Sequence, residues 1–292
     1  MRKISLGLII ASLMLTLCSS TAGAQNKLVF SVPFTLVDNR PFIEVKIKQH
    51  TFHFILDCGA DYGMDIATAK ILNLKLGHES MQGGAGAKLA KTWQADVDTV
   101  QIGPINILKT SFLVTDVSEI KNNLHLPYLD GFIGYTFMKN YAIQFDYPNK
   151  VINFYSTFSG ASPVPFSLYY GSIPKINALI DGKKAIVIMD TGDRTAFTLF
   201  NHFAIKTGII KNYTLSDTTI TGYGLGGPIY ARTLTLKQLQ IGKVNLTNVR
   251  SRIPMLKSGA FADTNIDGSV GGGVLKQYKV TIDYKTRNLY FE

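Results

Sequence analysis

Cysteine, tryptophan and charge are all scarce in this chain of 292 residues, which has 2 Cys, 1 Trp and only 17% charged residues. So few cysteines exclude a small scaffold held together by disulfides. The low charge, with 46% hydrophobic residues, excludes a disordered chain. No apolar run reaches the roughly 18 residues of a membrane-spanning helix, which excludes a polytopic membrane protein.

Clusters of like charge and of metal-ligating residues are missing too. The 30 Lys and Arg outnumber the 20 Asp and Glu but form no basic stripe, so we expect no nucleic-acid partner. The 5 His are scattered without the spacing of a metal site, and we expect no metal and no other cofactor. Glycines at 222, 224 and 227 match a dinucleotide fingerprint formally, but a strand pattern follows where that motif needs a helix.

Residues 1–24 have the pattern of a secretory signal peptide. Arg2 and Lys3 precede an apolar stretch over residues 6–17, and small residues at 22 and 24 mark a cleavage site before Gln25. A buried N-terminal helix, a membrane anchor and lipidation at Cys18 are the alternatives. We expect an exported protein, periplasmic or secreted from a bacterium, with no membrane span after cleavage and Cys58 as its one thiol.

The rest of the chain contains an internal duplication. The 17 Phe, 14 Tyr and frequent β-branched residues favour strands throughout. The matching segments are 54–60 with 186–193, 100–103 with 239–242, 130–134 with 267–271, and 146–147 with 283–284. Corresponding residues of the first three pairs lie 133, 139 and 137 positions apart, so the order and the spacing of the segments are preserved.

Each repeat has the pattern of a β-rich lobe. We therefore expect an all-β protein with a signal peptide (1–24), an N-terminal lobe (25–160) and a C-terminal lobe (161–292). The predicted elements are strands over 42–56 and 175–189, short helices over 66–76 and 200–207, hairpin tips at 83–86 and 222–227, and a connector over 156–171.

One aspartate in each repeat ends an apolar strand and precedes a small residue and Gly. Duplication places Asp57 and Asp190 face to face between the lobes. Two carboxyls a few ångström apart share a proton and titrate as a pair. The ionised member can deprotonate a water while the other protonates a carbonyl oxygen, which is acid–base hydrolysis of an amide.

These motifs resemble those of aspartic peptidases of the pepsin and retropepsin clan. Asp-Cys-Gly-Ala-Asp at 57–61 and Asp-Thr-Gly at 190–192 are similar to its Asp-Thr/Ser-Gly motifs. Phe-Ile-Gly at 132–134 and Ser-Val-Gly at 269–271 are similar to the segments that pack beneath each aspartate. Residues 32–39 resemble exported aspartyl-protease-like proteins of Bacteroidetes.

The resemblance implies an acid-protease fold with an interlobe cleft and a peptide or protein as substrate. Both aspartates come from one chain, so a monomer is implied. Carried over by position, the catalytic residues are Asp57 and Asp190, the motif-supporting residues are Cys58, Gly59, Thr191 and Gly192, and the substrate-contacting residues are Asp61 and Tyr223. An exposed position at a hairpin tip is the alternative for Tyr223.

The sequence departs from this family at three places. Cys58 stands where the family has Thr or Ser, and because a thiol is a weaker hydrogen-bond donor we expect an unbalanced network. Ser269 is less apolar than the usual residue, and Asp193 adds a third carboxylate, which raises the pKa of the pair. The leading hypothesis is an aspartic endopeptidase, and the alternative is a catalytically impaired relative that binds a peptide or another ligand in the cleft.

Overall fold

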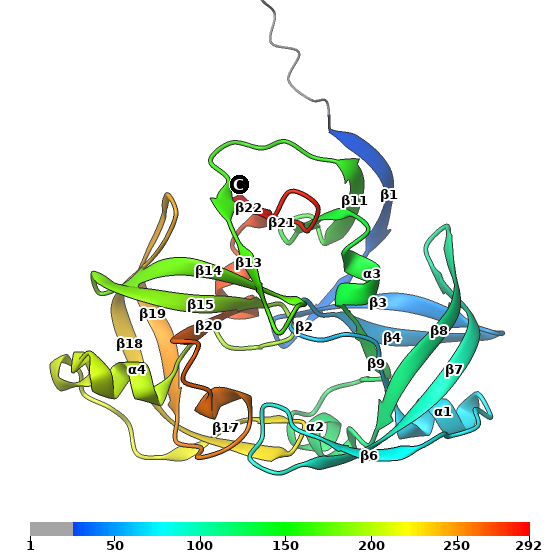
Figure 1. The fold of residues 1–292 in the computed structure, drawn as a ribbon, viewed down its shortest axis with the longest axis horizontal. Helices are drawn as coiled ribbons and strands as arrows, with labels where there is room; N and C mark the ends of the chain where they lie inside the picture. The colour runs from blue at the N-terminus through cyan, green and yellow to red at the C-terminus, as the bar shows by residue number, and fades with distance from the viewer. Residues whose placement is uncertain (1–25) are drawn as a thin grey trace, which may run out of the picture.

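The computed structural model describes residues 26–292, in which strands dominate and no helix is longer than six residues. The strands form one sheet in each lobe and a third sheet that joins the lobes (Figure 1). This confirms the predicted all-β, two-lobed fold. The predicted signal peptide and the lipidation alternative at Cys18 lie outside the described residues. No helix within residues 26–292 is long and apolar enough to cross a membrane.

The N-terminal lobe is an eight-stranded sheet with the order β2-β3-β4-β9-β5-β8-β7-β6. Short helices α1 (Ile66–Ile71), α2 (Ser118–Asn123) and α3 (Tyr135–Met138) lie between its strands. The strands are β2 (Thr35–Val37), β3 (Arg40–Ile47), β4 (His50–Leu56), β5 (Gly63–Asp65), β6 (Glu79–Gln82), β7 (Ala90–Ile102), β8 (Ile105–Thr115) and β9 (Gly131–Ile133).

The C-terminal lobe repeats this sheet with the order β13-β14-β15-β20-β16-β19-β18-β17, the counterpart of each N-terminal strand in turn. Helices α4 (Asn201–Lys206) and α5 (Gly272–Leu275) occupy the places of α1 and α3. The strands are β13 (Ser167–Tyr169), β14 (Ile173–Ile180), β15 (Lys183–Asp190), β16 (Phe197–Leu199), β17 (Thr219–Gly224), β18 (Gly227–Ile241), β19 (Val244–Pro254) and β20 (Gly268–Gly271).

A six-stranded sheet joins the two lobes, with the order β1-β11-β10-β21-β22-β12. At its centre β10 and β21 pair antiparallel, with Gln144 opposite Thr281. These two residues are 137 positions apart, the offset of the repeats themselves. A local two-fold axis therefore passes between them and relates one lobe to the other. The strands are β1 (Lys27–Pro33), β10 (Ala142–Asp146), β11 (Val151–Thr157), β12 (Val164–Pro165), β21 (Lys279–Asp283) and β22 (Asn288–Phe291).

Near the ends of the lobes, one strand was not predicted and one expectation is wrong. β1 precedes the predicted strands over 42–56 and completes the joining sheet by pairing with β11. The segment expected as a plain connector, 156–171, contains β12 and β13. β12 pairs with β22 near the end of the described chain, so no local pattern marks it. β13 pairs with the next strand, β14, in a local hairpin that the turn-rich composition of the segment conceals.

Alternating apolar residues build the core. In β3 the side chains of Ile43, Val45 and Ile47 are buried, whereas those of Glu44 and Lys46, which alternate with them, are exposed. One continuous hydrophobic cluster runs through both lobes and the joining sheet. Among the smaller separate clusters, one in each lobe borders the space between the lobes.

Candidate active site

Each motif aspartate is positioned by a pair of parallel strands. Asp57 follows β4, which runs parallel to β9, and its backbone N–H donates to Ile133 O at 2.9 Å. Gly134 lies directly below, where a Cβ atom would be 2.1 Å from Ala60 O and 2.8 Å from Asp57 O. Only glycine permits this close approach of two backbones, so the predicted partner segment does pack beneath the aspartate.

The second lobe repeats the arrangement. Asp190 ends β15, which runs parallel to β20 with Asp190 opposite Gly271. A Cβ atom on Gly271 would lie 2.6 Å from Asp193 O. The duplicated motifs therefore fold into the same strand–turn structure twice, as their spacing predicts.

The two carboxyl groups face each other across the lobe boundary. A Cβ atom on Gly59 would lie 2.7 Å from the carboxyl of Asp190, and one on Gly192 would lie 2.2 Å from Asp57 Oδ2. Each carboxyl thus packs on the glycine of the other motif. Each also accepts a hydrogen bond from the glycine N–H of its own motif, at 2.8 Å in the first lobe and 2.9 Å in the second.

A reciprocal set of hydrogen bonds links the two motif loops beneath the carboxyls. Thr191 Oγ1 donates to Leu56 O at 2.8 Å and accepts from the N–H of Cys58 at 2.9 Å. Cys58 Sγ donates to Met189 O at 3.2 Å and accepts from the N–H of Thr191 at 3.3 Å. The thiol therefore makes the same two contacts as its hydroxyl counterpart.

We expected an unbalanced network, but Cys58 Sγ and Thr191 Oγ1 make the same number of hydrogen bonds, so that expectation is wrong. The difference lies in bond length and donor strength, because sulfur is larger and less polar than oxygen. Cys58 is fully buried, and burial together with Asp190 and Asp57 raises the pKa of its thiol. The group consequently keeps the proton that it donates to Met189 O.

The two carboxyls lie in different electrostatic surroundings. Burial raises the pKa of both, and they hydrogen-bond each other. The pKa of Asp57 is pulled down again by the N–H of Gly59, by Asp190 and by the positive charge of Arg40, whereas the charges of Asp57 and Asp193 raise the pKa of Asp190 further. The negative charge of Asp193 thus raises the pKa of Asp190, which is the direction expected from the sequence.

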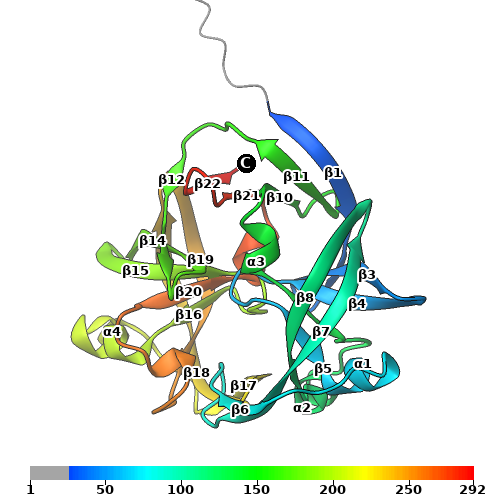
Figure 2. The ribbon, with the colours of Figure 1, turned by 45° about the vertical axis from the view of Figure 1, so that its right-hand side comes forward.

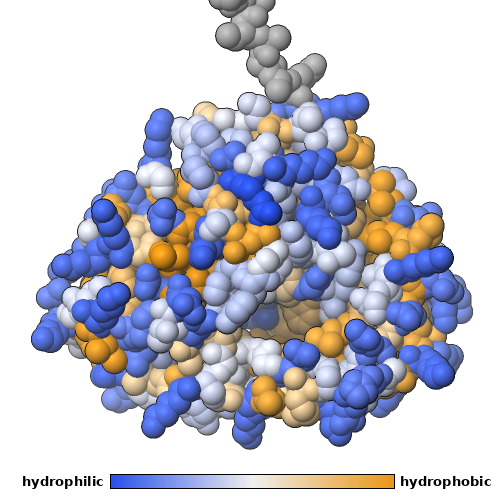
Figure 3. Space-filling model, viewed as in Figure 1, coloured by the Kyte–Doolittle hydropathy of each residue, from blue (hydrophilic) through white to orange (hydrophobic). Residues whose placement is uncertain are grey.

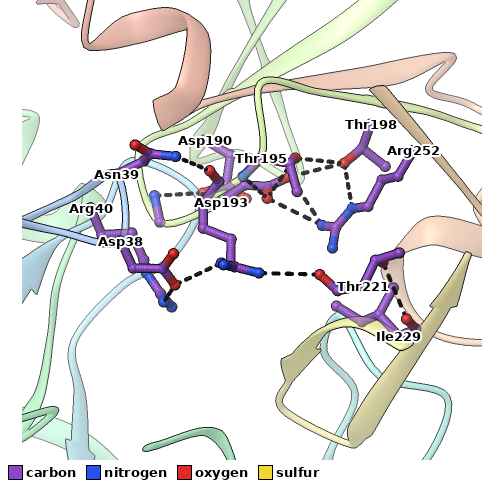
Figure 4. A network of polar contacts seen from close by, with 12 residues as sticks. Asp38, Asn39, Arg40, Asp190, Asp193, Thr195, Thr198, Thr221, Ile229 and Arg252 are labelled. Atoms are coloured by element: carbon purple, nitrogen blue, oxygen red, sulfur yellow. Dashed lines mark hydrogen bonds and ion pairs between the residues drawn. The ribbon is translucent and has the colours of Figure 1, made fainter. Parts of the chain in front are cut away.

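Asp193 belongs to a buried network beside the pair (Figure 4). Its carboxylate accepts hydrogen bonds from Thr195 at 2.9 Å and Thr198 at 3.0 Å, and pairs with Arg252 at 3.1 Å. The Arg252 guanidinium is the largest of the influences that lower the pKa of Asp193, against the effect of burial. Asp193 thus stays ionised next to Asp190.

A second charged group reaches the site from the other lobe (Figure 4). The β2–β3 hairpin turns at Asp38 and Asn39, both with positive φ, which is the geometry of a two-residue type I′ turn. Asp38 pairs with Arg40 at 2.5 Å and with Arg194 at 2.6 Å. Asn39 Nδ2 donates to Arg194 O at 2.7 Å, so this hairpin spans the lobe boundary.

A cavity of about 690 Å³ lies between the lobes. Asp57 and Asp190 lie on its wall, together with residues of both glycine-rich hairpins. In the space-filling view the molecule is hollowed between the lobes, and the recessed surface is less polar than the rim (Figure 3). The cavity wall is thus mainly apolar, with a few charged side chains that include the carboxyl pair.

The two predicted hairpin tips, β6–β7 and β17–β18, meet on the side of the cavity away from the joining sheet (Figure 2). Gly86 N–H donates to Leu225 O at 2.8 Å and Lys88 N–H donates to Gly226 O at 3.0 Å. A loop of the C-terminal lobe adds a bond from Ala260 N–H to Gly84 O at 2.9 Å. Both lobes therefore supply a flap, and the flaps are joined to each other.

Each flap also packs on the opposite lobe. Tyr223 of the C-terminal flap contacts the small cluster of the N-terminal lobe, which includes Phe42 and Val117. Ala85 of the N-terminal flap contacts the cluster of the C-terminal lobe, which includes Phe200. The half-buried position of Tyr223 on the cavity wall is not that of a free hairpin tip.

Asp61 lies on the cavity wall four residues after Asp57 and is exposed. Its carboxylate accepts hydrogen bonds from Thr136 Oγ1 at 2.8 Å and from the N–H of Thr136 at 3.0 Å. The structure therefore brings all of the predicted residues to one site: Asp57, Cys58, Gly59, Asp61, Asp190, Thr191, Gly192 and Tyr223. Among residues 26–292 no group of three or more His, Cys, Asp or Glu is placed to hold a metal ion.

Three charged residues of the site escaped the sequence analysis, namely Asp38, Arg40 and Arg252. Arg252 and Arg40 have side chains that are almost fully buried. No local pattern marks either of them, because Arg40 directly follows the polar turn residues Asp38 and Asn39, and Arg252 lies in a strand with several other polar residues. Asp38 is an ordinary turn residue by sequence, and only the folded chain brings it across the boundary.

Comparison with known protein families agrees with this geometry. Residues 43–137 match a family model described as aspartyl protease. The matched segment runs from β3 to α3 and contains Asp57 with the glycine segment beneath it, which supports an aspartyl protease family and protease function in general. No curated protein matches the chain. The second aspartate, Asp190, lies outside the matched segment, so its assignment depends on the duplication and on the geometry above.

Proposed function

We propose that the protein is an aspartic endopeptidase in which Asp57 and Asp190 activate a water for attack on a peptide bond. The observation that carries the proposal is the pair of carboxyls that face each other in the cleft, each against the glycine of the other motif. Opposed, coupled carboxyls sharing a proton are the acid–base arrangement that this reaction requires.

We propose different roles for the two members of the pair at the start of the reaction. Asp57, whose negative charge Arg40 stabilises, takes a proton from the water. Asp190, whose pKa is raised well above its ordinary value, donates its proton to the carbonyl oxygen. The resulting tetrahedral gem-diol collapses when Asp57 gives its proton to the amine nitrogen. The C–N bond breaks, the carbonyl forms again, and a hydroxyl proton of the gem-diol returns to Asp190. Opening of the joined flaps must precede entry of an extended peptide.

Cleavage of a diverse peptide library tests the proposal. The purified protein and the Asp190→Asn variant are incubated with the library from about pH 3 to 8, and the cuts are read by mass spectrometry. Cuts that are present with the wild type and vanish with a folded variant support the endopeptidase. Cuts that persist in the variant contradict it.

A cleft that binds peptide without turnover is the second candidate, and Cys58 is the observation that favours it. The thiol bonds of 3.2 and 3.3 Å hold their side of the site less firmly than the hydroxyl bonds of 2.8 and 2.9 Å. In that case the wild type binds peptides and cuts none of them. Cleavage that appears only in Cys58→Thr would identify this candidate.

We also propose that the protein is exported by way of residues 1–24 and acts as a monomer. Both carboxyls and both flaps come from one chain, which supports a complete site without a second copy. Sequencing of the N-terminus of the protein purified from its own cell tests the proposed export. Its molecular mass in solution tests the proposed monomer.

A further inference from the structure

The cleft carries opposite charges at two positions that the duplication makes equivalent. Asp61 follows Asp57 by four residues, and Arg194 follows Asp190 by four. Both line the cavity between the lobes. The two-fold axis that relates the lobes places equivalent residues on opposite sides of the carboxyl pair. One side of the pair is therefore acidic and the other side basic.

The basic side has an excess of positive charge. Arg40 and Arg194 share a single carboxylate, that of Asp38, at 2.5 and 2.6 Å. Two guanidinium groups and one carboxylate leave one positive charge within this cluster, and the same positive charge acts on Asp57 in the carboxyl pair. The carboxylate of the nearby Asp193 pairs with Arg252 at 3.1 Å rather than with either of these arginines.

These guanidinium groups also have donors to spare. A guanidinium carries five N–H bonds, and within the described part of the chain Arg40 Nε is buried without a hydrogen-bond acceptor. Arg40 is 5% exposed, whereas the side chain of Arg194 is 38% exposed on the cavity wall. A carboxylate oxygen that entered from the cavity would meet an arginine pair already held in place.

The β2–β3 hairpin keeps this pair rigid. Asn39 accepts a hydrogen bond from Lys276 Nζ at 3.0 Å and donates to Arg194 O at 2.7 Å. A Cβ atom on Gly272 would lie 1.9 Å from Asn39 O, so the hairpin tip is packed tightly on α5. The segment 32–39, which the aspartate motifs left without a role, thus places Asp38 and Arg40 across the lobe boundary.

We propose that Arg40 and Arg194 form a carboxylate-binding subsite, so that the cleft prefers peptides with an acidic side chain or a free C-terminal carboxylate on this side of the scissile bond. The proposal rests on the proposed peptide-binding function. Guanidinium–carboxylate recognition is strong and directional, and a single such contact changes affinity by about tenfold or more.

Binding in the Asp190→Asn background tests the subsite without cleavage. The probes are octapeptides of otherwise uncharged residues with an uncharged fluorescent label. In the first series the C-terminus is amidated, one Glu is placed at each position in turn, and each Glu peptide has a matched Gln peptide. The second series has a free C-terminus and no Glu. Fluorescence anisotropy near pH 7 gives each dissociation constant. We expect about tenfold tighter binding for Glu over Gln at one position, or for the free over the amidated C-terminus, which tells the two carboxylate sources apart.

Two variants with opposite expected effects on the preference for a carboxylate test the subsite. Arg194→Gln should abolish the preference, and Asp38→Asn should increase it, because Asn keeps the turn conformation and releases both arginines. The exposed Arg250→Gln should leave it unchanged. Equal binding of Glu and Gln peptides, or a preference that survives in Arg194→Gln, overturns the subsite but not the peptidase. Failure of every peptide to bind overturns both.

Discussion

At the scale of single residues, the site depends on how two duplicated loops exchange hydrogen bonds. Cys58 and Thr191 occupy equivalent positions and make equivalent contacts, although one is a thiol and the other a hydroxyl. The thiol is tolerated because its partners, Met189 O and the N–H of Thr191, are backbone groups that still find a partner at sulfur distance.

Removal of this thiol should therefore cost stability. Cys58→Ala leaves Met189 O and the N–H of Thr191 buried and unpaired, and we expect the free energy of unfolding to fall by about 1–3 kcal/mol. Cys58→Ser keeps a donor and an acceptor in the same place and should lose clearly less. Urea unfolding of the three proteins measures this. Equal losses in the two variants would show that the contacts contribute nothing beyond packing.

The charged neighbours of the carboxyl pair govern the pH dependence. The pKa of Asp190 is raised, so its protonated form contributes stability that is complete below about pH 4 and is lost as the pH rises through the raised pKa. The pKa of Asp193 is lowered, so its ionised form contributes stability above about pH 4 that is lost as the pH falls through the lowered pKa.

Substitution of Asp193 should consequently shift the activity profile. In Asp193→Asn a negative charge beside Asp190 is removed and Arg252 stays, so the pKa of Asp190 falls and the alkaline limb of kcat/KM moves to lower pH. The profile is measured well below the unfolding temperature, because an unpaired buried Arg252 costs about 3–5 kcal/mol. Asp263→Asn, also on the cavity wall, is the control and should leave the limb in place. Movement of the limb to higher pH contradicts the assignment.

At the scale of elements, the flaps are the parts that must move. They close the cavity through backbone hydrogen bonds between their tips and through packing of each flap on the opposite lobe. Gly226 has φ +92° and faces Lys88 O, where a Cβ atom would be at 2.1 Å. Side-chain-free residues at the tips are therefore required for closure.

Gly226→Ala should hold the flaps apart. We expect faster hydrogen exchange at the amides of Gly86 and Lys88, because the bonds that protect them are broken. KM for peptides should rise as well. Gly182→Ala is a matched control, since Gly182 also has positive φ, at +76°, but nothing lies within 4 Å of its Cβ position. Rapid exchange of both amides in the wild type would show that the flaps are not joined in solution.

The elements also show how far sequence reasoning extends. The duplication, the hairpin tips and the helix after each aspartate were predicted, because each has a local signal such as alternation, glycine or a repeat. The joining sheet was not predicted, because β10 pairs with β21 across 137 positions. The aspartates Asp130 and Asp267 marked the repeats without an explanation, and the structure supplies one: each accepts the backbone N–H of a neighbouring strand, at 2.7 and 2.8 Å.

The site shows the same division. Asp57 and Asp190 could be predicted from the sequence, because each follows a strand pattern directly and is followed by a small residue and Gly. Arginines that influence the carboxyl groups can lie far from them along the sequence. Arg252, for example, reaches Asp193 from another strand of the folded sheet. Contacts of that kind are set by sheet order, which a single sequence does not state.

At the scale of the whole molecule, the two lobes share one core. A continuous core runs through both lobes and the joining sheet, and the motif loops bond across the boundary. Separation of the lobes would expose this core and divide the carboxyl pair. The site therefore exists only in the complete fold.

We accordingly predict that both lobes unfold in one transition. Trp93 is the one tryptophan of the chain and lies in β7, so its fluorescence reports on the N-terminal lobe alone. Far-ultraviolet circular dichroism reports on the strands of both lobes. The two urea curves should coincide. A fluorescence midpoint that differs from the dichroism midpoint would show that the lobes are independent.

The central claim is that Asp57 and Asp190 act together on one water. The most direct test is kcat/KM for a single peptide, chosen from the most frequent cut in the library, with the wild type, Asp57→Asn and Asp190→Asn, all verified as folded. The account predicts a loss of at least about a thousandfold in each variant, with peptide affinity retained. Activity of either variant within tenfold of the wild type would contradict it.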